Sequence, residues 1–262
     1  MAQIRIGVVQ FAPRDSVNAN LDAIRAAIAE LGHCDLYVLP EYSTWHHPDP
    51  GTWGSAGDAV SGDVIAGLVQ LASDTSSTIV AGALVEDGGS LRNRVHVVDA
   101  SGVIATYDKV HLYDAFGAKE SDVITAGDPS APAVVVDVNG VRVGVQTCYD
   151  IRFPEVSRRL VDAGAEVLVV PADWVPGPNK VEQWTTLLRA RAIENVAWVV
   201  AADHAAPTGV GHSLVIDPLG LVVAELGEQP QACAVSVDAE SITDARRTNP
   251  ALDLRRYRVV PR

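Results

Sequence analysis

Cysteine and lysine are scarce in this sequence, and the scarcity excludes several classes of protein. Three of the 262 residues are cysteine, an odd and widely spaced set: Cys34, Cys148 and Cys233. Such a set forms neither a disulfide framework nor a zinc-binding pattern. Three of the 20 basic residues are lysine: Lys109, Lys119 and Lys180. A lysine inside a motif is therefore a stronger functional signal here than in a lysine-rich chain.

Positive charge and long apolar runs are scarce as well. The chain carries 33 acidic and 20 basic residues, a net charge of −13, and has no basic cluster that would suit nucleic acid or an anionic membrane. No run approaches the roughly 18–20 apolar residues of a membrane span. The start, MAQIRIGVVQF, lacks the regions of a signal peptide. We therefore expect a cytoplasmic protein with an acidic surface that binds neither nucleic acid nor membrane.

The chain does contain a regular alternation of strand patterns and helix patterns. Its first half has strands at 4–10, 35–40 and 78–86, helices at 20–31 and 63–74, and a hairpin-like pair at 94–99 and 102–110. After a loop at 111–132, the second half has strands at 141–147, 165–171 and 197–203, helices at 155–164 and 181–195, a pair at 211–217 and 220–226, and a last strand at 231–238. Each half thus reads β-α-β-α-β followed by a hairpin.

The two halves also resemble each other in sequence. IRIGVV at 4–9 resembles VRVGVQ at 141–146, and LYVLP at 36–40 resembles VLVVP at 167–171. Each half predicts a mixed sheet with helices on one face and an apolar opposite face. Two such faces packed together predict an α/β fold, an α-β-β-α sandwich of two mixed sheets with internal pseudo-two-fold symmetry. A doubly wound sheet is the alternative, although no GxGxxG fingerprint supports it.

We expect residues 1–262 to form one domain. The stretch 241–262 lacks clear helical periodicity, and we expect a C-terminal arm there.

Three residues of complementary chemistry stand at predicted strand ends. Cys148 follows the strand 141–147, Glu41 follows the strand 35–40, and Lys109 ends the strand 102–110. Ligands in open α/β architectures bind at such an edge. A thiol with an ordinary pKa near ~8.5 needs a base or a cation to become a nucleophile. Glu41 is the candidate base, and Lys109 and the N–H of Tyr149 are the candidate oxyanion donors.

The segments around these residues resemble a known family. LPEYS at Glu41, YDKVHLYD at Lys109 and CYDIRFPE at Cys148 resemble the three signatures of the nitrilase superfamily of carbon–nitrogen hydrolases. The resemblance implies an α-β-β-α sandwich, a Glu41–Lys109–Cys148 triad, a thioester intermediate and no cofactor. It also implies a second glutamate, Glu120, that positions Lys109 or orients substrate. The alternatives are a turn acid at Glu41, an exposed edge lysine at Lys109 and a loop-surface acid at Glu120.

Further residues are candidates for the substrate pocket. Asp173 and Trp174 follow the strand that matches the one before Glu41, so we expect them to line the pocket. Trp174 would be an apolar wall, or alternatively a core residue, and the main chain near Asp173 would accept the substrate NH₂. Tyr42 is a weaker candidate. For Arg152, a structural ion pair with Glu155 is preferred to binding a substrate carboxylate.

The segment EYSTWHHPDP contains Glu41, His46, His47 and Asp49 but does not have the spacing of a metal site. We expect no metal, and a loop over the mouth of the active site. His111 and His212 are expected to be hydrogen-bonded structural residues.

These features predict an amidase that hydrolyses a small aliphatic amide to a carboxylate and ammonia. Cys148-Tyr149-Asp150 resembles the amidase branch of the superfamily rather than nitrilases, which usually read Cys-Trp-Glu. An ω-amidase of dicarboxylate monoamides, an N-carbamoyl amide hydrolase and a nitrilase remain alternatives, as does a catalytically idle interaction module of the same fold. The resemblance further implies a homodimer or a larger even-numbered assembly through the helix 155–164, with the C-terminal arm crossing to the partner.

Overall fold

The computed structural model describes residues 3–56 and 62–261, and within them twelve strands form two six-stranded sheets. The first sheet has the order β12 (Gln231–Asp238), β1 (Gln3–Gln10), β2 (Leu36–Val38), β3 (Thr78–Asp87), β4 (Ser90–Asp99) and β5 (Gly102–Asp108). The second has the order β11 (Val222–Glu225), β10 (Leu214–Ile216), β9 (Trp198–Ala202), β8 (Val167–Pro171), β7 (Val141–Val145) and β6 (Val135–Val138). Both sheets mix parallel and antiparallel pairs.

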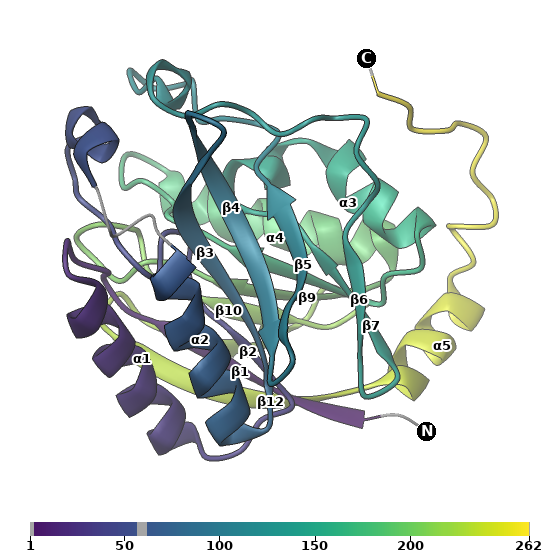
Figure 1. Ribbon diagram of the computed structural model, residues 1–262. Coiled ribbons are helices and arrows are strands. Elements are labelled where there is room, and N and C mark those ends of the chain that lie inside the picture. Colours follow the sequence, from purple (N-terminus) through teal and green to yellow (C-terminus); the bar gives the residue numbers. More distant parts are fainter. Residues whose placement is uncertain (1–2, 57–61, 262) are drawn as a thin grey trace.

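Two helices cover the outer face of each sheet (Figure 1). Helices α1 (Val17–Leu31) and α2 (Gly62–Thr75) pack on the first sheet, and α3 (Pro154–Asp162) and α4 (Lys180–Asn195) pack on the second. The predicted α-β-β-α sandwich is therefore confirmed, and the doubly wound alternative is wrong. None of the helices in the described part of the chain is long and apolar enough to cross a membrane.

Alternation along β1 shows how the layers form. Ile4, Ile6 and Val8 pack into the core between the two sheets, whereas Val9 packs under α1 and α2. Successive strand residues point to opposite faces, so one strand serves both interfaces. Burying each of these side chains contributes roughly 1.5–3 kcal/mol. The two sheets and their helices are thus held by apolar packing on both faces.

The repeated glycine of the two halves has a packing reason. A Cβ at Gly7 would lie 2.7 Å from the Tyr37 ring, and a Cβ at Gly144 would lie 2.8 Å from the Cβ of Ala165. Only glycine permits such close approach. The sequence similarity between the halves therefore reflects a shared packing requirement.

Two strands differ from the sequence-based expectation. β6 forms a hairpin with β7 across Asn139-Gly140, a two-residue turn of the kind that Asn-Gly favours. β12 pairs with β1 of the first sheet rather than with the second half.

The predicted C-terminal arm also needs correction, since its first part is the helix α5 (Ala239–Thr248), capped by Asp238. Only Ile242 and Ala245 of this helix are buried, so its apolar periodicity is weak. Residues 249–261 follow without long regular structure, and residue 262 lies outside the described part.

Candidate active site

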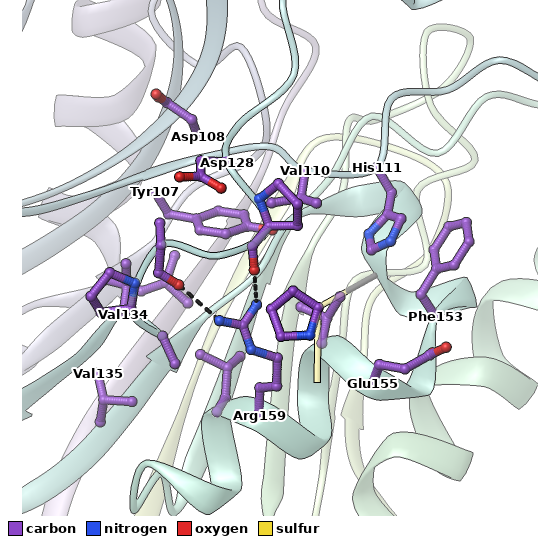
Figure 2. A pocket seen from close by; sticks show the side chains of 18 of the residues that line it. Tyr107, Asp108, Val110, His111, Asp128, Val134, Val135, Phe153, Glu155 and Arg159 are labelled. Atoms are coloured by element: carbon purple, nitrogen blue, oxygen red, sulfur yellow. Dashed lines mark hydrogen bonds between the residues drawn. The ribbon is translucent and has the colours of Figure 1, made fainter. Parts of the chain in front are cut away.

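Two cavities stand out among the described residues. The larger, about 980 Å³, lies between β5, α3 and residues 259–261, and Arg159 in it donates to the carbonyls of Pro129 and Ala131 at 2.7 and 2.8 Å (Figure 2). The smaller, about 470 Å³, is lined by Glu41, Lys109, Glu120, Cys148 and Asp173 among others. A thiol, an ammonium group and three carboxyl groups meet only in the smaller of these two. We therefore take the smaller cavity as the candidate active site.

The ends of strands from both sheets deliver these side chains. Lys109 directly follows β5, and Glu41 lies shortly after β2 in the first sheet. Cys148 follows β7 as the first residue of a 3-10 turn, Cys148–Arg152, in the second. Its φ of 44° lies in the left-handed region, which is strained for a non-glycine residue. The Asp150 carboxylate accepts the N–H of Thr147 at 3.1 Å and stabilises this turn.

The main chain of Glu41 is held tightly at the junction of the sheets. Its N–H donates to the carbonyl of Ala172 at 3.3 Å, and its carbonyl accepts Nε2–H of His204 at 2.5 Å. A Cβ at Gly82 would lie 2.6 Å from the Cα of Glu41. Gly82 therefore makes room for the Glu41 backbone.

Lys109 lies between two carboxylates. Its Nζ donates to Glu41 Oε1 at 2.9 Å and to Glu120 Oε2 at 2.9 Å. The side chain is 2% exposed. Burial acts to lower the pKa of Lys109, but Glu120 and Glu41 outweigh it and hold the pKa well above its ordinary value. Lys109 is therefore a permanent cation at the floor of the cavity.

The two glutamates differ in their proton affinity. Burial raises the pKa of Glu41, and Lys109 opposes this only in part. Burial alone would also raise the pKa of Glu120. The Lys109 charge and the hydrogen bonds from Asn93 and Tyr113 outweigh burial, so the pKa of Glu120 is lowered. Environments that push the pKa values of two carboxyl groups apart separate their chemical roles. Glu41 is the group suited to exchange protons, while Glu120 stays ionised.

Cys148 is buried, with 4% of its surface exposed. Burial raises its pKa well above the ordinary value, with a further contribution from Glu41 that Lys109 opposes. The thiol donates a long hydrogen bond of 3.5 Å to the main-chain carbonyl of Asp173. The group is thus a protonated thiol that requires a base before it can attack.

The other predicted pocket residues lie in different places. Tyr42 lines the cavity and donates its O–H to Glu120 at 2.7 Å. Asp173 lines it too, and its N–H donates to Glu41 Oε2 at 2.9 Å. Tyr149 is the second residue of the Cys148 turn, and its ring packs on Tyr113.

Trp174 and Arg152 depart from expectation. The Trp174 ring is buried and packs against the Trp184 ring with 5.3 Å between the centroids, which favours the alternative of a core residue over an apolar wall of the pocket. Arg152 makes no ion pair with Glu155 within the described structure. It donates instead to Gln183 at 2.6 Å and lies over the Trp174 ring.

Several residues of the site were not found from the sequence. Asn93 in β4 donates to Glu41 at 2.5 Å and to Glu120 at 3.0 Å. An asparagine inside a strand is unfavourable and is the signal that could have found it. His204 and His46 both lie beside Asp173, an arrangement that no local spacing encodes. The loop with His46 does border the cavity through Pro48, Pro50 and Trp53, as expected.

The sandwich fold is that of the nitrilase superfamily. A family model described as carbon-nitrogen hydrolase matches residues 5–247, so the chain belongs to this family. It is accordingly a hydrolase acting on C–N bonds other than peptide bonds, and an idle interaction module is not supported.

Relatives extend over most of the chain. A protein named as a hydrolase from Mycobacterium tuberculosis is 36% identical over 93% of this chain and 92% of its own length. A deaminated glutathione amidase of Escherichia coli is 34% identical over 92% of both chains. Among solved structures, the NitFhit protein of C. elegans matches with a TM-score of 0.89 and 28% identity, covering 98% of this chain and 66% of that one.

Proposed function

We propose that this hydrolase is a cysteine-dependent amidase for small amides that carry a carboxylate, such as the ω-amide of a dicarboxylic acid. The carrying observation is the position of Lys180. Lys109 and Lys119 line the cavity, and Lys180 donates a hydrogen bond of 3.0 Å to Tyr113, which lines it as well. Lys109 and Lys119 are already paired with carboxylates, whereas Lys180 has no carboxylate partner among the described residues. In a chain with a net charge of −13, Lys180 is therefore the lysine suited to an anionic substrate.

Two further features of the cations beside the cavity support an anionic substrate. Neither Lys180 nor Arg152 has a carboxylate partner within the described residues. Lys180 Nζ lies 4.1 Å from the ring centroid of Phe116, and Arg152 lies 4.8 Å from that of Trp174. Burial, followed by Arg152, lowers the pKa of Lys180, as expected for cations without compensating charge. A substrate carboxylate would supply that charge.

The relatives named deaminated glutathione amidase favour the same choice. A neutral small aliphatic amide, preferred from the sequence alone, is therefore less well supported than an ω-amide.

In the proposed mechanism, Glu41 takes the proton from the Cys148 thiol, and sulfur attacks the amide carbonyl. The negative charge that forms on oxygen is held by the Lys109 ammonium and the N–H of Tyr149. Glu120 keeps Lys109 charged and in place. The Asp173 carbonyl accepts a hydrogen bond from the substrate NH₂.

Collapse of this intermediate breaks the C–N bond. Ammonia leaves with the proton from Glu41, and the acyl group remains on Cys148 as a thioester. Water then attacks the thioester while Glu41 accepts its proton. The carboxylic acid is released and the Cys148 thiol is restored.

A matched substrate pair tests the proposal. Succinamate and butyramide have the same carbon skeleton up to the terminal group, which is a carboxylate in one and a methyl group in the other. We expect kcat/KM for ammonia release to be about 10- to 100-fold higher for succinamate, since a charge-assisted hydrogen bond contributes about 1.5–3 kcal/mol. Equal or faster turnover of butyramide would contradict the proposed preference for an anionic substrate. Faster turnover of the corresponding nitrile or of an N-carbamoyl amino acid would instead indicate a nitrilase or an N-carbamoyl amide hydrolase.

Lys180→Met separates substrate recognition from chemistry. The variant should lose about 10-fold in kcat/KM for succinamate, in line with the loss of one charged partner, and keep its rate on butyramide. Lys119→Met, which removes a largely exposed lysine already paired with Asp122, should change both rates little. An equal loss on both substrates would place Lys180 in a structural role.

The assembly of the protein is part of the proposal. We propose a homodimer or a larger even-numbered assembly formed through α3, as the family resemblance implies. Light scattering on the full chain measures the mass directly, and a strictly monomeric species would rule this assembly out.

A further inference from the structure

A fully buried carboxylate, that of Asp150, joins the segments that carry Lys109 and Cys148. Asp150 follows Cys148 by two residues in the 3-10 turn. Its partners Tyr107 and His111 stand two residues before and two residues after Lys109. The Tyr107 hydroxyl donates to one carboxylate oxygen at 2.7 Å, and Nδ1 and the main-chain N–H of His111 lie 2.8 and 3.3 Å from the other. We refer to the side chains of Tyr107, His111 and Asp150 as the Asp150 bridge.

Donors occupy both oxygens of this carboxylate. The oxygen that accepts Tyr107 also accepts the main-chain N–H of Thr147 at 3.1 Å, so two donors reach each oxygen. Asp150 therefore acts only as an acceptor, which is the role of an ionised carboxylate, and Nδ1 of His111 carries a proton. Burial, followed by the Asp150 charge, raises the pKa of Tyr107 well above its ordinary value, so its O–H remains a donor. Hydrogen bonds to an ionised acceptor are the stronger kind.

The two segments are otherwise anchored in their own sheets. The main-chain N–H of Lys109 donates to the carbonyl of Asn93 in β4 at 2.9 Å. The hydroxyl of Thr147 donates to the carbonyl of Pro171 in β8 at 2.7 Å. These two bonds hold each segment within its half of the molecule and do not relate one segment to the other. The bonds of Asp150 do so, because they cross from the turn after β7 to β5 and the residues that follow it.

An aromatic neighbour fixes the imidazole of the bridge. Phe153, the residue after the 3-10 turn, lies nearly parallel to the His111 ring, with 3.7 Å between the centroids and 8° between the planes. Figure 2 shows both rings at the wall of the larger cavity. The stacking limits rotation of the imidazole, so Nδ1 stays directed at Asp150.

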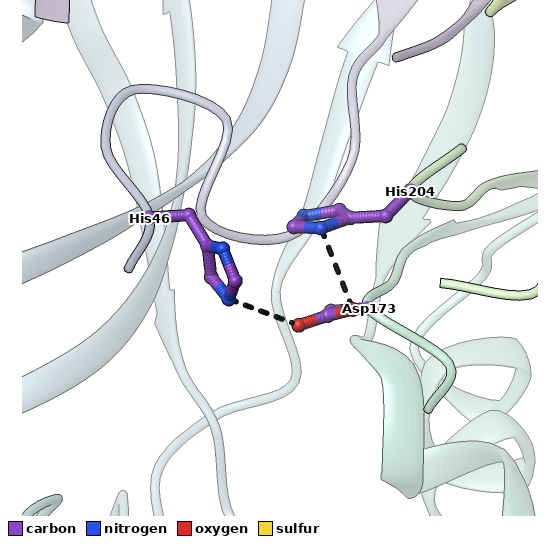
Figure 3. A group of neighbouring side chains, drawn as sticks. All are labelled: His46, Asp173 and His204. Carbon is purple, nitrogen blue, oxygen red and sulfur yellow. Dashed lines mark ion pairs between the residues drawn. The ribbon is translucent and has the colours of Figure 1, made fainter. Parts of the chain in front are cut away.

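A second aspartate near the thiol provides a contrast. Asp173, whose main-chain carbonyl accepts the Cys148 thiol, has looser side-chain contacts. His46 Nε2 lies 3.4 Å from one of its carboxylate oxygens, and His204 Nδ1 lies 3.4 Å from the other (Figure 3). The four donors of Asp150 lie closer, at 2.7 to 3.3 Å. Asp150 is therefore the more tightly held of the two carboxylates.

We propose that the Asp150 bridge positions Lys109 relative to Cys148 across the two sheets. This inference rests on the proposed function, in which the thiol attacks while Lys109 and the N–H of Tyr149 hold the oxyanion. Tyr149 lies between Cys148 and Asp150, so the same bonds place both oxyanion donors. The members of the bridge are positioning residues, because they act through the groups that react. A misplacement of about 1 Å in an active site can cost about 10²-fold in rate.

A matched set of histidine variants tests the bridge by the kinetics of succinamate hydrolysis. His111→Phe keeps a ring against Phe153 but removes the donor to Asp150, so kcat should fall about 10- to 100-fold with KM nearly unchanged. His111→Asn, whose amide N–H can lie where Nδ1 lies, should recover most of kcat. His212→Phe is the control, because His212 Nδ1 also faces a carboxylate, that of Glu225 at 3.2 Å, and both constants should stay unchanged.

Alkylation of Cys148 by iodoacetamide tests the bridge without an amide substrate. Lys109 opposes the rise in the Cys148 pKa that burial and Glu41 cause, so loss of the ammonium from its place lowers the thiolate fraction. The alkylation rate, followed by mass spectrometry, should fall about 10-fold in His111→Phe and return in His111→Asn, because the thiolate is the reacting form. In the Lys109→Met background, His111→Phe should cause no further loss.

The two readouts separate failure of the bridge from failure of the proposed function. Turnover that survives Cys148→Ala would overturn the proposed function. If Cys148→Ala is inactive, an unchanged kcat and alkylation rate in His111→Phe would overturn the bridge alone, as would a lowered melting temperature without a kinetic effect. Circular dichroism verifies each fold, and Tyr107→Phe, which removes a single oxygen, replaces His111→Phe if that variant fails to fold. Tyr107→Phe should show the same loss of kcat and of alkylation rate to a smaller extent.

Discussion

The two halves of the molecule share their architecture but not their chemistry. In the first half, β2 and β5 lead into Glu41 and Lys109, an acid and a cation. In the second half, β7 and β8 lead into Cys148 and Asp173, a thiol and the carbonyl that accepts its hydrogen bond. The repeat thus preserves packing, whereas the reactive groups are divided between the sheets. Neither half contains a complete candidate site, which exists only where the two sheets meet.

The largest expected effect tests the contribution of the second half. Cys148→Ala should lower ammonia release by at least about 10⁴-fold, since no other group can form the thioester. Cys233→Ser, in the partly buried end strand β12, is the matched control and should keep its activity. Mass spectrometry of a quenched reaction should find the acyl adduct on Cys148 alone. Turnover that survives Cys148→Ala would remove the nucleophile from the proposal.

The next effect compares the two glutamates of the first half. Glu41→Gln should lower kcat by about 10²- to 10⁴-fold, the range for a general acid–base group. Glu120→Gln should have a smaller effect on kcat, because Glu120 acts through Lys109. Steady-state kinetics on both variants measures the difference. If Glu120→Gln had the larger effect, the roles assigned from their opposite pKa shifts would be reversed.

A smaller effect tests the junction between the halves. Gly82→Ala should lower kcat by about 10²-fold with the fold retained, because its Cβ would displace the Glu41 main chain and a misplacement of 1 Å is costly in an active site. Gly54→Ala is the control, since a Cβ there meets nothing within 4 Å. Unchanged kinetics in Gly82→Ala would show that the Glu41 main chain can shift without loss.

The smallest effect concerns stability and pH. The folded-state pKa of Glu120 is lowered, so its ionised form stabilises the fold above the ordinary glutamate pKa of about 4.3. This contribution is lost as the pH falls through the lowered folded-state pKa. Glu120→Gln should therefore cost on the order of 1–3 kcal/mol in urea denaturation at neutral pH, and the difference from the unaltered chain should shrink in acid. A difference that grows in acid would contradict the direction of the shift.

The sequence was sufficient to predict most of the fold. Alternating strands and amphipathic helices define each half, and IRIGVV and VRVGVQ mark the repeat. β6 was missed although Val-Val-Asp-Val stands before an Asn-Gly turn, because its neighbours are proline-rich loop. Helix α5 was missed because its buried face consists of so few residues. β12 was found with the right bounds, but its partner strand β1 lies at the opposite end of the chain.

For the candidate site, sequence reasoning succeeded where a strand end determines position. Glu41, Lys109 and Cys148 follow strands and meet at one edge for that reason. Sequence reasoning failed for side chains whose position depends on packing between segments far apart in the chain. Asn93 reaches Glu41 across 52 residues, and Lys180 reaches Tyr113 across 67. No local pattern specifies such contacts, so the position of Lys180 beside the cavity and the His46–Asp173–His204 cluster could be found only from the structure.

The pairing of β12 with β1 has a consequence for the order of the chain. The two strands form eight antiparallel residue pairs, from Gln3 opposite Asp238 to Gln10 opposite Gln231. The chain's first and last strands are therefore neighbours, while the exposed connection 128–132 separates the halves. A circularly permuted chain that opens in this connection and joins the old ends through a linker would keep every neighbouring strand in both sheets. In such a chain β12 and β1 would become consecutive strands of one sheet.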